Sequence, residues 1–455
     1  MYPEPPLGAS KHVAVCCKIN LKTACSFPPV RKTRNFAKAD WDSINTHLSE
    51  CNFKAPYSSS AEQHLHDLVD VANGHIQEAI RLFVPLKISG GKRKKTWFGP
   101  ACFKTLKTKV RTYKKWRLSK LPADRASYKL ALARHRAAIS AAKGTHHARV
   151  SEKLRASTGR VWWNQVNDIL VKNYKPPIPG LSKDGIDFTS DSEKADVLNR
   201  YFADQTNLVV PPGHDIKSDS KAPSSLLCNV RVTHAKMLRL LLAQVESKAT
   251  GSDQVPASFL KHCALALHKP FAHIFSLSLK LGIFPKQWKI ADVVALHKKK
   301  SKSDPSNYRP ISLLPIVSKI FEQIVNDQLS QFLAPKLNAH QFGFRAGHTT
   351  TDLLTLMSQS WKDALAAGGE ARAVALDISK AFDRVWHDGL LHKLESFGVS
   401  GSLLAWVRSF LSDRSQRVVV GDSGSSFLPI RAGVPQGSVL APLLFLVFIN
   451  VQRSV

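Results

Sequence analysis

Residues 374–383 read VALDISKAFD, an apolar segment that ends in an acid. Large apolar residues alternate with Ala375 and Asp377, which is the period-two pattern of a buried strand. Burying a carboxylate there costs free energy unless the group is paired or binds a cation. The segment therefore predicts a strand over 374–378. Asp377 could bind a cation. The alternative is that an Asp in this segment only caps a helix that begins near Asp383. For Asp383 itself, a structural or capping role and a chemical role are both open.

Three further stretches narrow the interpretation. Residues 432–438 read AGVPQGS, a tight Gly/Pro loop that precedes the apolar run 439–449. Upstream lie YRPIS at 308–312 and FGFRAGHTT at 342–350. In this order and with this spacing, the four stretches resemble motifs of reverse transcriptases, with 374–383 and 432–438 similar to motifs A and B. The upstream stretches 308–312 and 342–350 are similar to the fingers of non-LTR (LINE-type, jockey-like) retrotransposon enzymes.

The resemblance implies an RNA-directed DNA polymerase that binds an RNA template, a DNA primer and a dNTP, and that uses two Mg²⁺ ions. By resemblance, Asp377 is the catalytic and metal-bridging acid, and the carbonyl of Ile378 is a further metal ligand. Phe382 corresponds to the aromatic residue that excludes a ribose 2′-hydroxyl. Gln436 would line the nucleotide sugar, where Gly433 would allow close approach of the backbone.

The resemblance also implies the domain organisation. Residues 281–455 would be the reverse transcriptase domain, with fingers at about 284–366 and a partial palm with an antiparallel sheet at about 367–455. Residues 1–180 would form a basic, mostly helical linker region, and 181–280 a helical segment leading into the polymerase. The predicted fold is thus mainly α in the N-terminal half and then α/β, an incomplete right-hand polymerase.

Two predicted strands, Trp288–His297 and Asn307–Ile311, are joined by a basic tip. A triphosphate requires cations held on a rigid backbone, and arginine can bind two oxygens at once. By resemblance, Arg309 and Lys298 would hold the phosphates of the incoming nucleotide. The alternative is a hairpin tip that is only solvated.

Template or primer contacts are predicted for Lys299 and Lys300 in the same tip, and for Arg345, which lies between Gly343 and Gly347. For Arg345 a structural ion pair is an equal alternative. Thr349 and Asp352 have the spacing of a capping box at the start of the next helix.

The family's other two acids lie in a Tyr-x-Asp-Asp hairpin after motif B. This sequence has no Asp-Asp pair, and Val451–Val455 stands where that hairpin is expected. We therefore expect a C-terminally truncated chain that is not a competent polymerase by itself. The alternative function is a non-catalytic nucleic-acid-binding remnant.

The composition favours a polyanionic partner. Lys+Arg 65 against Asp+Glu 34 gives a net charge of +31 and a pI near 10.0. No signal peptide is recognisable, and the apolar run 439–451 is too short to span a bilayer. The seven cysteines contain no CxxC pair, as expected of reduced thiols. We expect a cytoplasmic or nuclear protein that binds nucleic acid and no membrane.

The segment Lys104–Leu154 is predicted to be helical, and it combines many Lys and Arg residues with Tyr113, Trp116 and Tyr128. Its charges of one sign favour phosphate contacts, although such a face can also be only solvated. Proline-rich linkers are predicted at 175–180 and 211–225. Apolar periodicity predicts further helices at 38–48, 62–83, 162–171, 191–202, 233–245 and 258–281.

Overall fold

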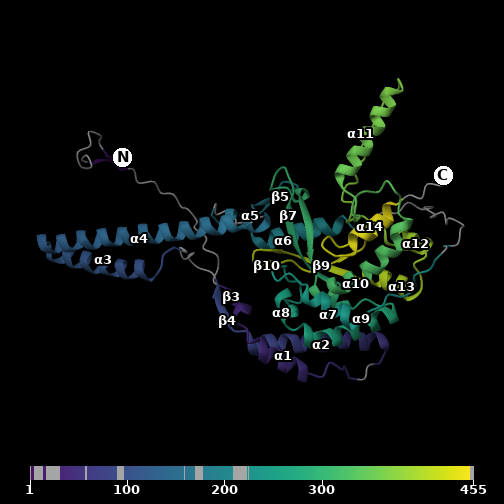
Figure 1. The fold of residues 1–455 in the computed structure, drawn as a ribbon, viewed down its shortest axis with the longest axis horizontal. Coiled ribbons are helices and arrows are strands. Elements are labelled where there is room, and N and C mark those ends of the chain that lie inside the picture. The colour runs from purple at the N-terminus through teal and green to yellow at the C-terminus, as the bar shows by residue number, and fades with distance from the viewer. Residues whose placement is uncertain are drawn as a thin grey trace. The chain divides into compact units, whose positions relative to one another are not determined.

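The computed structural model describes residues 2–4, 14–16, 31–56, 59–89, 97–157, 159–169, 178–208, 223 and 225–450. The chain divides into two compact units (Figure 1). The first comprises Met1–Arg34 with Leu86–Pro176, and the second comprises Asn35–Pro85 with Pro177–Val455.

The first unit is built around a long helical hairpin. Its strands form two antiparallel pairs, β1 (Tyr2–Glu4) with β2 (Ala14–Cys16) and β3 (Arg31–Arg34) with β4 (Leu86–Ser89). Its helices are α3 (Pro100–Ser119), α4 (Pro122–Ala156) and α5 (Gly159–Ile169). Helices α3 and α4 pack along each other and confirm the helical prediction for 104–154.

Local sequence sets the turn of this hairpin. Lys120 ends α3 in the left-handed conformation, with φ of 53°. Pro122 then opens α4 in the first turn, where its missing N–H leaves no hydrogen bond unmade. Between the helices, Cys102 and Ala131 are buried, and Thr105 Oγ1 lies 3.0 Å from Nδ1 of the buried His135. Tyr113 and Trp116 of α3 also pack on Tyr128 of α4, so small, polar and aromatic side chains together hold the hairpin.

Helices dominate the second unit. They are α1 (Trp41–Glu50), α2 (Ala61–Phe83), α6 (Asp191–Asp204), α7 (His234–Leu242), α8 (Ala257–His262), α9 (Ala264–Leu281), α10 (Ile316–Leu333), α11 (Thr350–Ala366), α12 (His387–Ser396), α13 (Gly401–Leu411) and α14 (Ala441–Ile449). In α2, Ser60 caps the start by accepting a hydrogen bond from Gln63 N, and Leu65, Leu68 and Ile76 form a buried stripe at helical spacing. The helices predicted from periodicity are present, except that the one predicted at 258–281 is interrupted at Cys263 and residues 170–171 lie outside the described ranges.

An aromatic cluster joins α9, α10 and α13 at the centre of the larger core. Phe275 stacks on Phe321 with ring centroids 4.1 Å apart, and Phe284 meets Trp406 edge to face at 5.4 Å. These side chains are fully buried. Rings in such offset and edge-to-face contacts contribute to stability beyond their buried area.

The main sheet has the order β10 (Ser423–Gly424), β9 (Arg414–Val420), β7 (Ile290–His297), β8 (Tyr308–Leu313), and β11 (Leu428–Ile430) also pairs with β9. Helix α6 packs on β9, where Leu198 and Phe202 meet Val293 and Val418 in a second, smaller core. A separate hairpin is formed by β5 (Leu181–Lys183) and β6 (Ile186–Phe188). The strands predicted at 288–297 and 307–311 are thus confirmed.

The strand predicted at 374–378 is wrong for this structure. Val374, Leu376 and Ile378 are exposed, and the segment has no regular secondary structure. A strand exists only where a neighbour pairs with its backbone, and none of the described strands pairs with this segment. The helix expected near Asp383 begins later, at His387, because residues 379–384 form turns.

Two further predictions need correction. The sheet is mixed, since β7 and β9 run parallel although the other pairs are antiparallel. The region predicted as 1–180 is divided, because α1 and α2 bury their apolar stripes in the core of the second unit.

Most of the linkers predicted at 175–180 and 211–225 lies outside the described residues. No helix in the described ranges has the length and apolar composition needed to cross a membrane.

Candidate nucleotide and nucleic-acid site

Cations lie near the tip of the β7–β8 hairpin, where the loop 298–307 joins the two strands. Lys298 follows β7 directly, and its N–H donates to the carbonyl of Asn307 at 2.8 Å. Arg309 lies on β8 opposite Leu296. Partial burial lowers the pKa of Lys298, and repulsion from Lys380 and Arg309 adds to this effect. Lys298 therefore lies within electrostatic reach of both Lys380 and Arg309.

Lys380 is the member of this group whose ammonium is buried. Its Nζ has no hydrogen-bond partner among the described residues. The ammonium lies 4.8 Å from the ring centroid of Tyr201 in α6, a cation–π contact. The backbone of Lys380 is left-handed, with φ of 54°, which is uncommon for a residue with a side chain. Asp383 and Asp377 are the acids whose charges act on neighbouring Lys298.

Asp383 connects this group to the loop 432–438. Its N–H donates to the carbonyl of Lys380 at 2.9 Å, and its Oδ1 accepts a hydrogen bond from Gln436 Nε2 at 2.8 Å. Burial raises the pKa of Asp383, while the hydrogen bond from Gln436 and the charges of Lys380 and Lys298 oppose the shift. The carboxyl therefore orients Gln436 and caps no helix.

The loop 432–438 is tied to both neighbouring segments through its backbone. Val434 N donates to Phe382 O at 2.8 Å, Gly433 N donates to Val385 O at 2.8 Å, and Ser312 N on β8 donates to Gln436 O at 2.7 Å. A Cβ on Gly433 would lie 2.8 Å from the carbonyl oxygens of Phe382 and Asp383. Gly433 therefore approaches the protein's own backbone closely, and its predicted approach to a nucleotide stays a prediction.

Phe382 lies between two other aromatic rings. It stacks on Phe445 of α14 with centroids 4.9 Å apart and meets Phe344 at 5.7 Å. The contact with Phe445 fixes the ring beside Asp383. Gln436 and Phe382 thus lie on two segments that are hydrogen bonded to each other.

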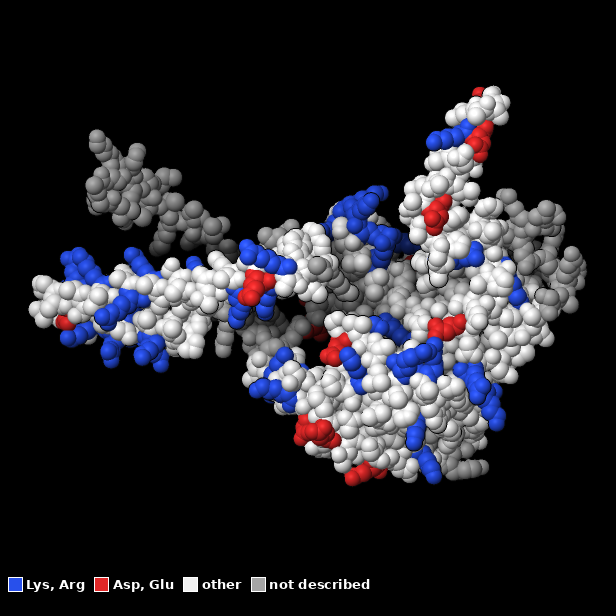
Figure 2. Space-filling model, in the orientation of Figure 1, with Lys and Arg blue, Asp and Glu red and all other residues white. Residues whose placement is uncertain are grey.

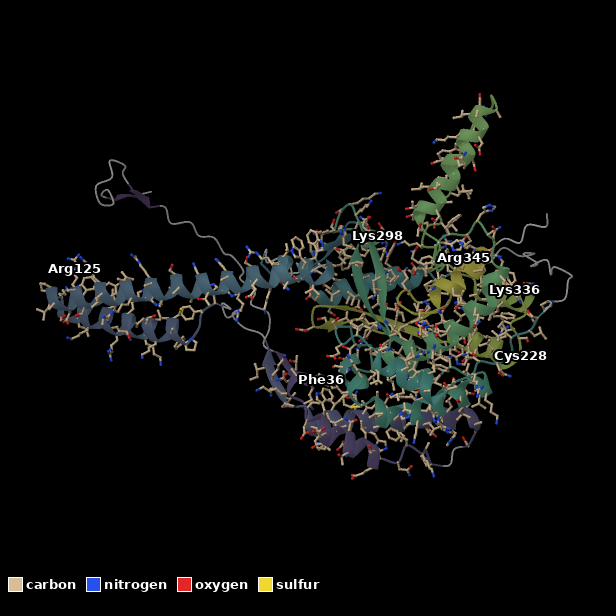
Figure 3. All side chains as sticks on the ribbon, viewed as in Figure 1. Phe36, Arg125, Cys228, Lys298, Lys336 and Arg345 are labelled. Carbon is tan, nitrogen blue, oxygen red and sulfur yellow. The ribbon has the colours of Figure 1, made fainter. Side chains whose placement is uncertain are left out.

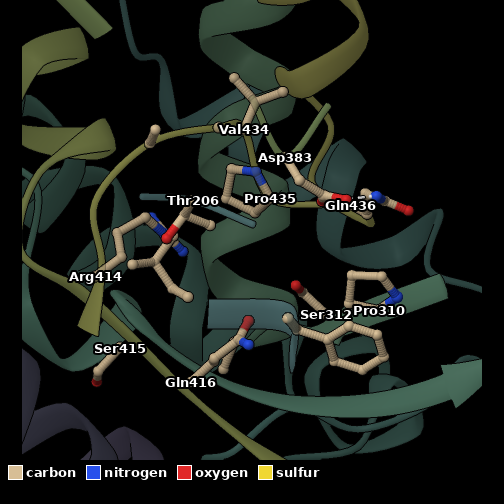
Figure 4. A pocket seen from close by; sticks show the side chains of 15 residues that line it. Thr206, Pro310, Ser312, Asp383, Arg414, Ser415, Gln416, Val434, Pro435 and Gln436 are labelled. Carbon is tan, nitrogen blue, oxygen red and sulfur yellow. Dashed lines mark hydrogen bonds between the residues drawn. The ribbon is translucent and has the colours of Figure 1, made fainter. Parts of the chain in front are cut away.

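A small cavity lies between α6, the sheet and the loop 432–438 (Figure 4). Its lining includes Thr206, Ser312, Asp383 and Gln436. With a volume of about 40 Å³, it has room for one or two water molecules and none for a nucleotide.

Arg345 lies away from Lys298 in the second unit (Figure 3). Its guanidinium donates to the carbonyls of Asn338 at 2.8 Å and of Gln341 at 3.3 Å. These bonds hold the loop that precedes α11, where Thr349 and Asp352 form the predicted capping box. The predicted ion-pair alternative is replaced by bonds to main-chain carbonyls. Lys299 and Lys300 are exposed at the hairpin tip.

Residues 297–452 match the family model of reverse transcriptase (RNA-dependent DNA polymerase). The chain carries a reverse transcriptase domain. The match begins at the end of β7 and includes the cation group, the acids and the loop 432–438.

Similar proteins support the more specific resemblance. The chain is 39% identical over 204 residues to a probable RNA-directed DNA polymerase from transposon BS, and 37% identical over 220 residues to the RNA-directed DNA polymerase from mobile element jockey, both of Drosophila melanogaster. A probable RNA-directed DNA polymerase from transposon X-element of the same fly is 28% identical over 360 residues. The predicted resemblance to non-LTR retrotransposon enzymes is confirmed.

The chain spans only part of these relatives. The matches cover 44%, 48% and 75% of this chain, but 22%, 24% and 38% of the respective relatives.

Reverse transcriptases use divalent metal ions, and two such ions require several carboxylates. In this reverse transcriptase domain Asp377 is exposed, whereas Asp383 is engaged by Gln436. Among the described residues, no three His, Cys, Asp or Glu side chains come together closely enough to hold a metal ion. The described donors therefore do not fit a two-metal centre by themselves.

Sequence reasoning missed two members of the site. Lys380 could have been noticed, since it is a cation three residues after Asp377 in a turn of small residues. Tyr201 gave no signal, because it reaches Lys380 only through the packing of α6 on the sheet.

Proposed function

We propose that this chain is the part of a non-LTR retrotransposon's RNA-directed DNA polymerase that binds the template and the incoming dNTP. The observation that carries this proposal is the convergence of Lys298, Arg309 and Lys380 beside Asp377 and Asp383. Cations this close repel one another, and an anion bound among them would relieve the repulsion. A triphosphate supplies that anion.

Each predicted residue receives a role in this proposal. Lys298, Arg309 and, in addition, Lys380 bind the triphosphate. Phe382 excludes the 2′-hydroxyl, and Gln436 with Gly433 lines the sugar. These assignments agree with the position of the loop 432–438, which is hydrogen bonded to Phe382 and to β8.

The remaining assignments concern the metal and the template. We propose Mg²⁺ as the divalent ion, with the Asp377 carboxylate and the Ile378 carbonyl as two hard oxygen ligands. Lys299, Lys300 and Arg345 would contact the template or primer backbone. Residues 284–366 would act as fingers and 367–455 as part of the palm. The relatives named as RNA-directed DNA polymerases support this function, and an intracellular location follows from it.

The test is the binding of a fluorescent dNTP to the chain in complex with an RNA template and a DNA primer, in the presence of Mg²⁺. In Lys298→Gln/Arg309→Gln we expect the dNTP affinity to fall by about 10–100-fold, because charged hydrogen bonds to phosphate are lost. The primer–template affinity should change much less.

Lys269→Gln/Lys280→Gln is the matched control, since it removes the same charge from exposed positions on α9. It should retain the wild-type dNTP affinity. Equal dNTP binding by all three proteins would contradict the proposed site. Nucleic-acid binding without any dNTP binding would instead favour the non-catalytic remnant.

A further inference from the structure

The helical hairpin of the first unit carries a large excess of positive charge. We call residues 100–156, which form α3 and α4, the basic hairpin. Its acids are Asp124 and Glu152, so 16 cations and two acids give a net charge of 16 − 2 = +14. The cations are Lys104, Lys107, Lys109, Arg111, Lys114, Lys115, Arg117, Lys120, Arg125, Lys129, Arg134, Arg136, Lys143, Arg149, Lys153 and Arg155.

Four of these cations form one line on α3. An α-helix turns by about 100° per residue, so Lys104, Lys107, Arg111 and Lys114 fall within a sector of about 80°. We call these four residues the α3 stripe, and all of them are exposed. The side of α3 that packs on α4, marked by the buried Cys102, is on the opposite face. Lys and Arg side chains gather over the hairpin in the space-filling view (Figure 2).

The spacing within the stripe makes it unfavourable in isolation. Successive members are three or four residues apart, which places like charges side by side on the helix surface. Within the described part of the hairpin, the ion pair that forms is Lys115 with Asp124, at 2.8 Å. Negative charge from a bound partner would therefore reduce the repulsion among the four stripe residues.

The length of the stripe matches a nucleic-acid backbone. Ten residues separate its ends, which is about 15 Å of helix. One strand of a duplex carries a phosphate about every 3.4 Å along its axis, so about four phosphates face a stripe of this length. Four cations over the same length can meet them one to one.

Three of the hairpin's aromatic residues, Tyr113, Trp116 and Tyr128, contact one another within the hairpin, whereas Phe103 is exposed beside Lys107. Trp116 stacks on Tyr128 with centroids 5.6 Å apart, and Tyr113 contacts Tyr128 at 5.2 Å. Arg125, near the turn (Figure 3), lies over Trp116 at 5.9 Å. Because Trp116 and Tyr128 cover each other, they offer no free platform for stacked bases. The stripe therefore fits phosphates and not base sequence.

An anionic membrane is the competing partner for a basic surface. A membrane-binding helix has a broad apolar face beside its cations. The exposed apolar residues of α3, Phe103, Val110 and Leu118, lie seven or eight residues apart with exposed cations between them, so they form no broad apolar face. Nucleic acid is the better match.

We propose that the α3 stripe docks the phosphodiester backbone of a nucleic acid, without reading its sequence, as a contact separate from the nucleotide site. The contact is electrostatic, so it weakens steeply with salt. Both RNA and DNA present this backbone. This contact does not depend on polymerisation, because residues 104–114 alone make it.

The test compares the full chain with Lys104→Gln/Lys107→Gln/Arg111→Gln/Lys114→Gln, which leaves the Lys115–Asp124 pair intact. Affinities for a 30-nucleotide RNA, a DNA of the same sequence and vesicles containing phosphatidylserine are measured over a series of salt concentrations. Affinity falls with salt, so the slope of log K against log salt is negative. In the variant we expect the magnitude of this slope to be smaller than in wild type by about 3 for the nucleic acids, at about 0.7–0.9 per phosphate contact. A scrambled RNA should behave like the original.

The control is Lys54→Gln/Lys269→Gln/Lys280→Gln/Lys286→Gln, which removes the same charge from exposed positions of the second unit. It should keep the wild-type slope, and far-UV circular dichroism should show equal helicity for both variants. A stripe variant that retains the slope of the control overturns the proposal. So does a variant that loses vesicle binding while RNA and DNA binding stay unchanged. Loss with only one of the two nucleic acids would support the proposal and identify its partner.

Discussion

Asp253 illustrates how single residues in this protein respond to burial. It belongs to the turn that packs against the start of α10, where a Cβ on Gly251 would lie 2.4 Å from the backbone of Leu314 and Pro315. Burial raises the pKa of Asp253 from 3.8 to about 6, although the N–H of Val255 donates to its carboxylate.

A pH dependence of stability follows from Asp253. Between pH 4 and 6 the folded state binds more protons than the unfolded state, so stability falls as the pH rises through that range. In Asp253→Asn this loss is absent. The free energy of unfolding of the variant, relative to wild type, should therefore increase by about 1–3 kcal/mol from pH 4 to 7. Urea unfolding at several pH values measures it, and a constant difference would contradict the raised pKa.

At the scale of residues, interactions between sequence neighbours could be predicted, whereas contacts that depend on the fold could not. The capping pair Thr349 and Asp352 was predictable, because a cap depends on neighbours three residues apart. The bonds from Arg345 to main-chain carbonyls were not, since they depend on how a glycine-rich loop folds back on residue 338. The left-handed conformation of Lys380 also has no local signature.

Among the elements, the loop 432–438 depends most on close packing. Gly433 has φ of +88° and approaches Phe382 and Asp383 too closely for any side chain. Gly433→Ala should therefore lower the free energy of unfolding by about 2–4 kcal/mol, from backbone strain and overpacking together. Gly347→Ala is the control, because Gly347 has φ of +76° but no atom within 4 Å of the position that a Cβ would occupy. It should lose only about 1 kcal/mol, from the backbone alone.

Chemical denaturation followed by fluorescence gives both values. Equal losses in the two variants would show that the contact between 432–438 and 382–385 is unimportant for stability. A larger loss at Gly433 is the expected result.

At the scale of elements, helices were predictable and one strand was not. The stripe of α2 fixes its buried face within the helix itself, so 62–83 is close to the observed Ala61–Phe83. The segment 374–378 has strand periodicity, but a strand also needs a pairing neighbour from elsewhere in the chain. The parallel pairing of β7 with β9 could not be predicted for the same reason, because about 120 residues separate the paired strands in the sequence.

At the scale of the whole molecule, the core is confined to the second unit. Among the described residues, neither hydrophobic cluster includes one from 86–176. Replacing residues 97–157 by a flexible Gly-Ser linker should therefore change the free energy of unfolding of the second unit by less than about 0.5 kcal/mol. The buried Trp288 and Trp406 report that transition by fluorescence. Loss of a cooperative transition would show that the units depend on each other.

The charge of the molecule was predictable from composition, whereas its division into units was not. The excess of +31 already indicated a polyanion. That residues 35–85 join the core across an inserted helical hairpin depends on tertiary packing, which periodicity cannot reveal.

The most direct measurement of the central claim is template-dependent dNTP binding by this chain. The chain is bound to an RNA template and DNA primer, and the affinity for dTTP and dGTP is measured with A and then with C as the next template base. The account predicts that exchanging the base exchanges the preferred dNTP, by about tenfold or more in each direction. Equal affinities for both nucleotides on both templates would contradict it.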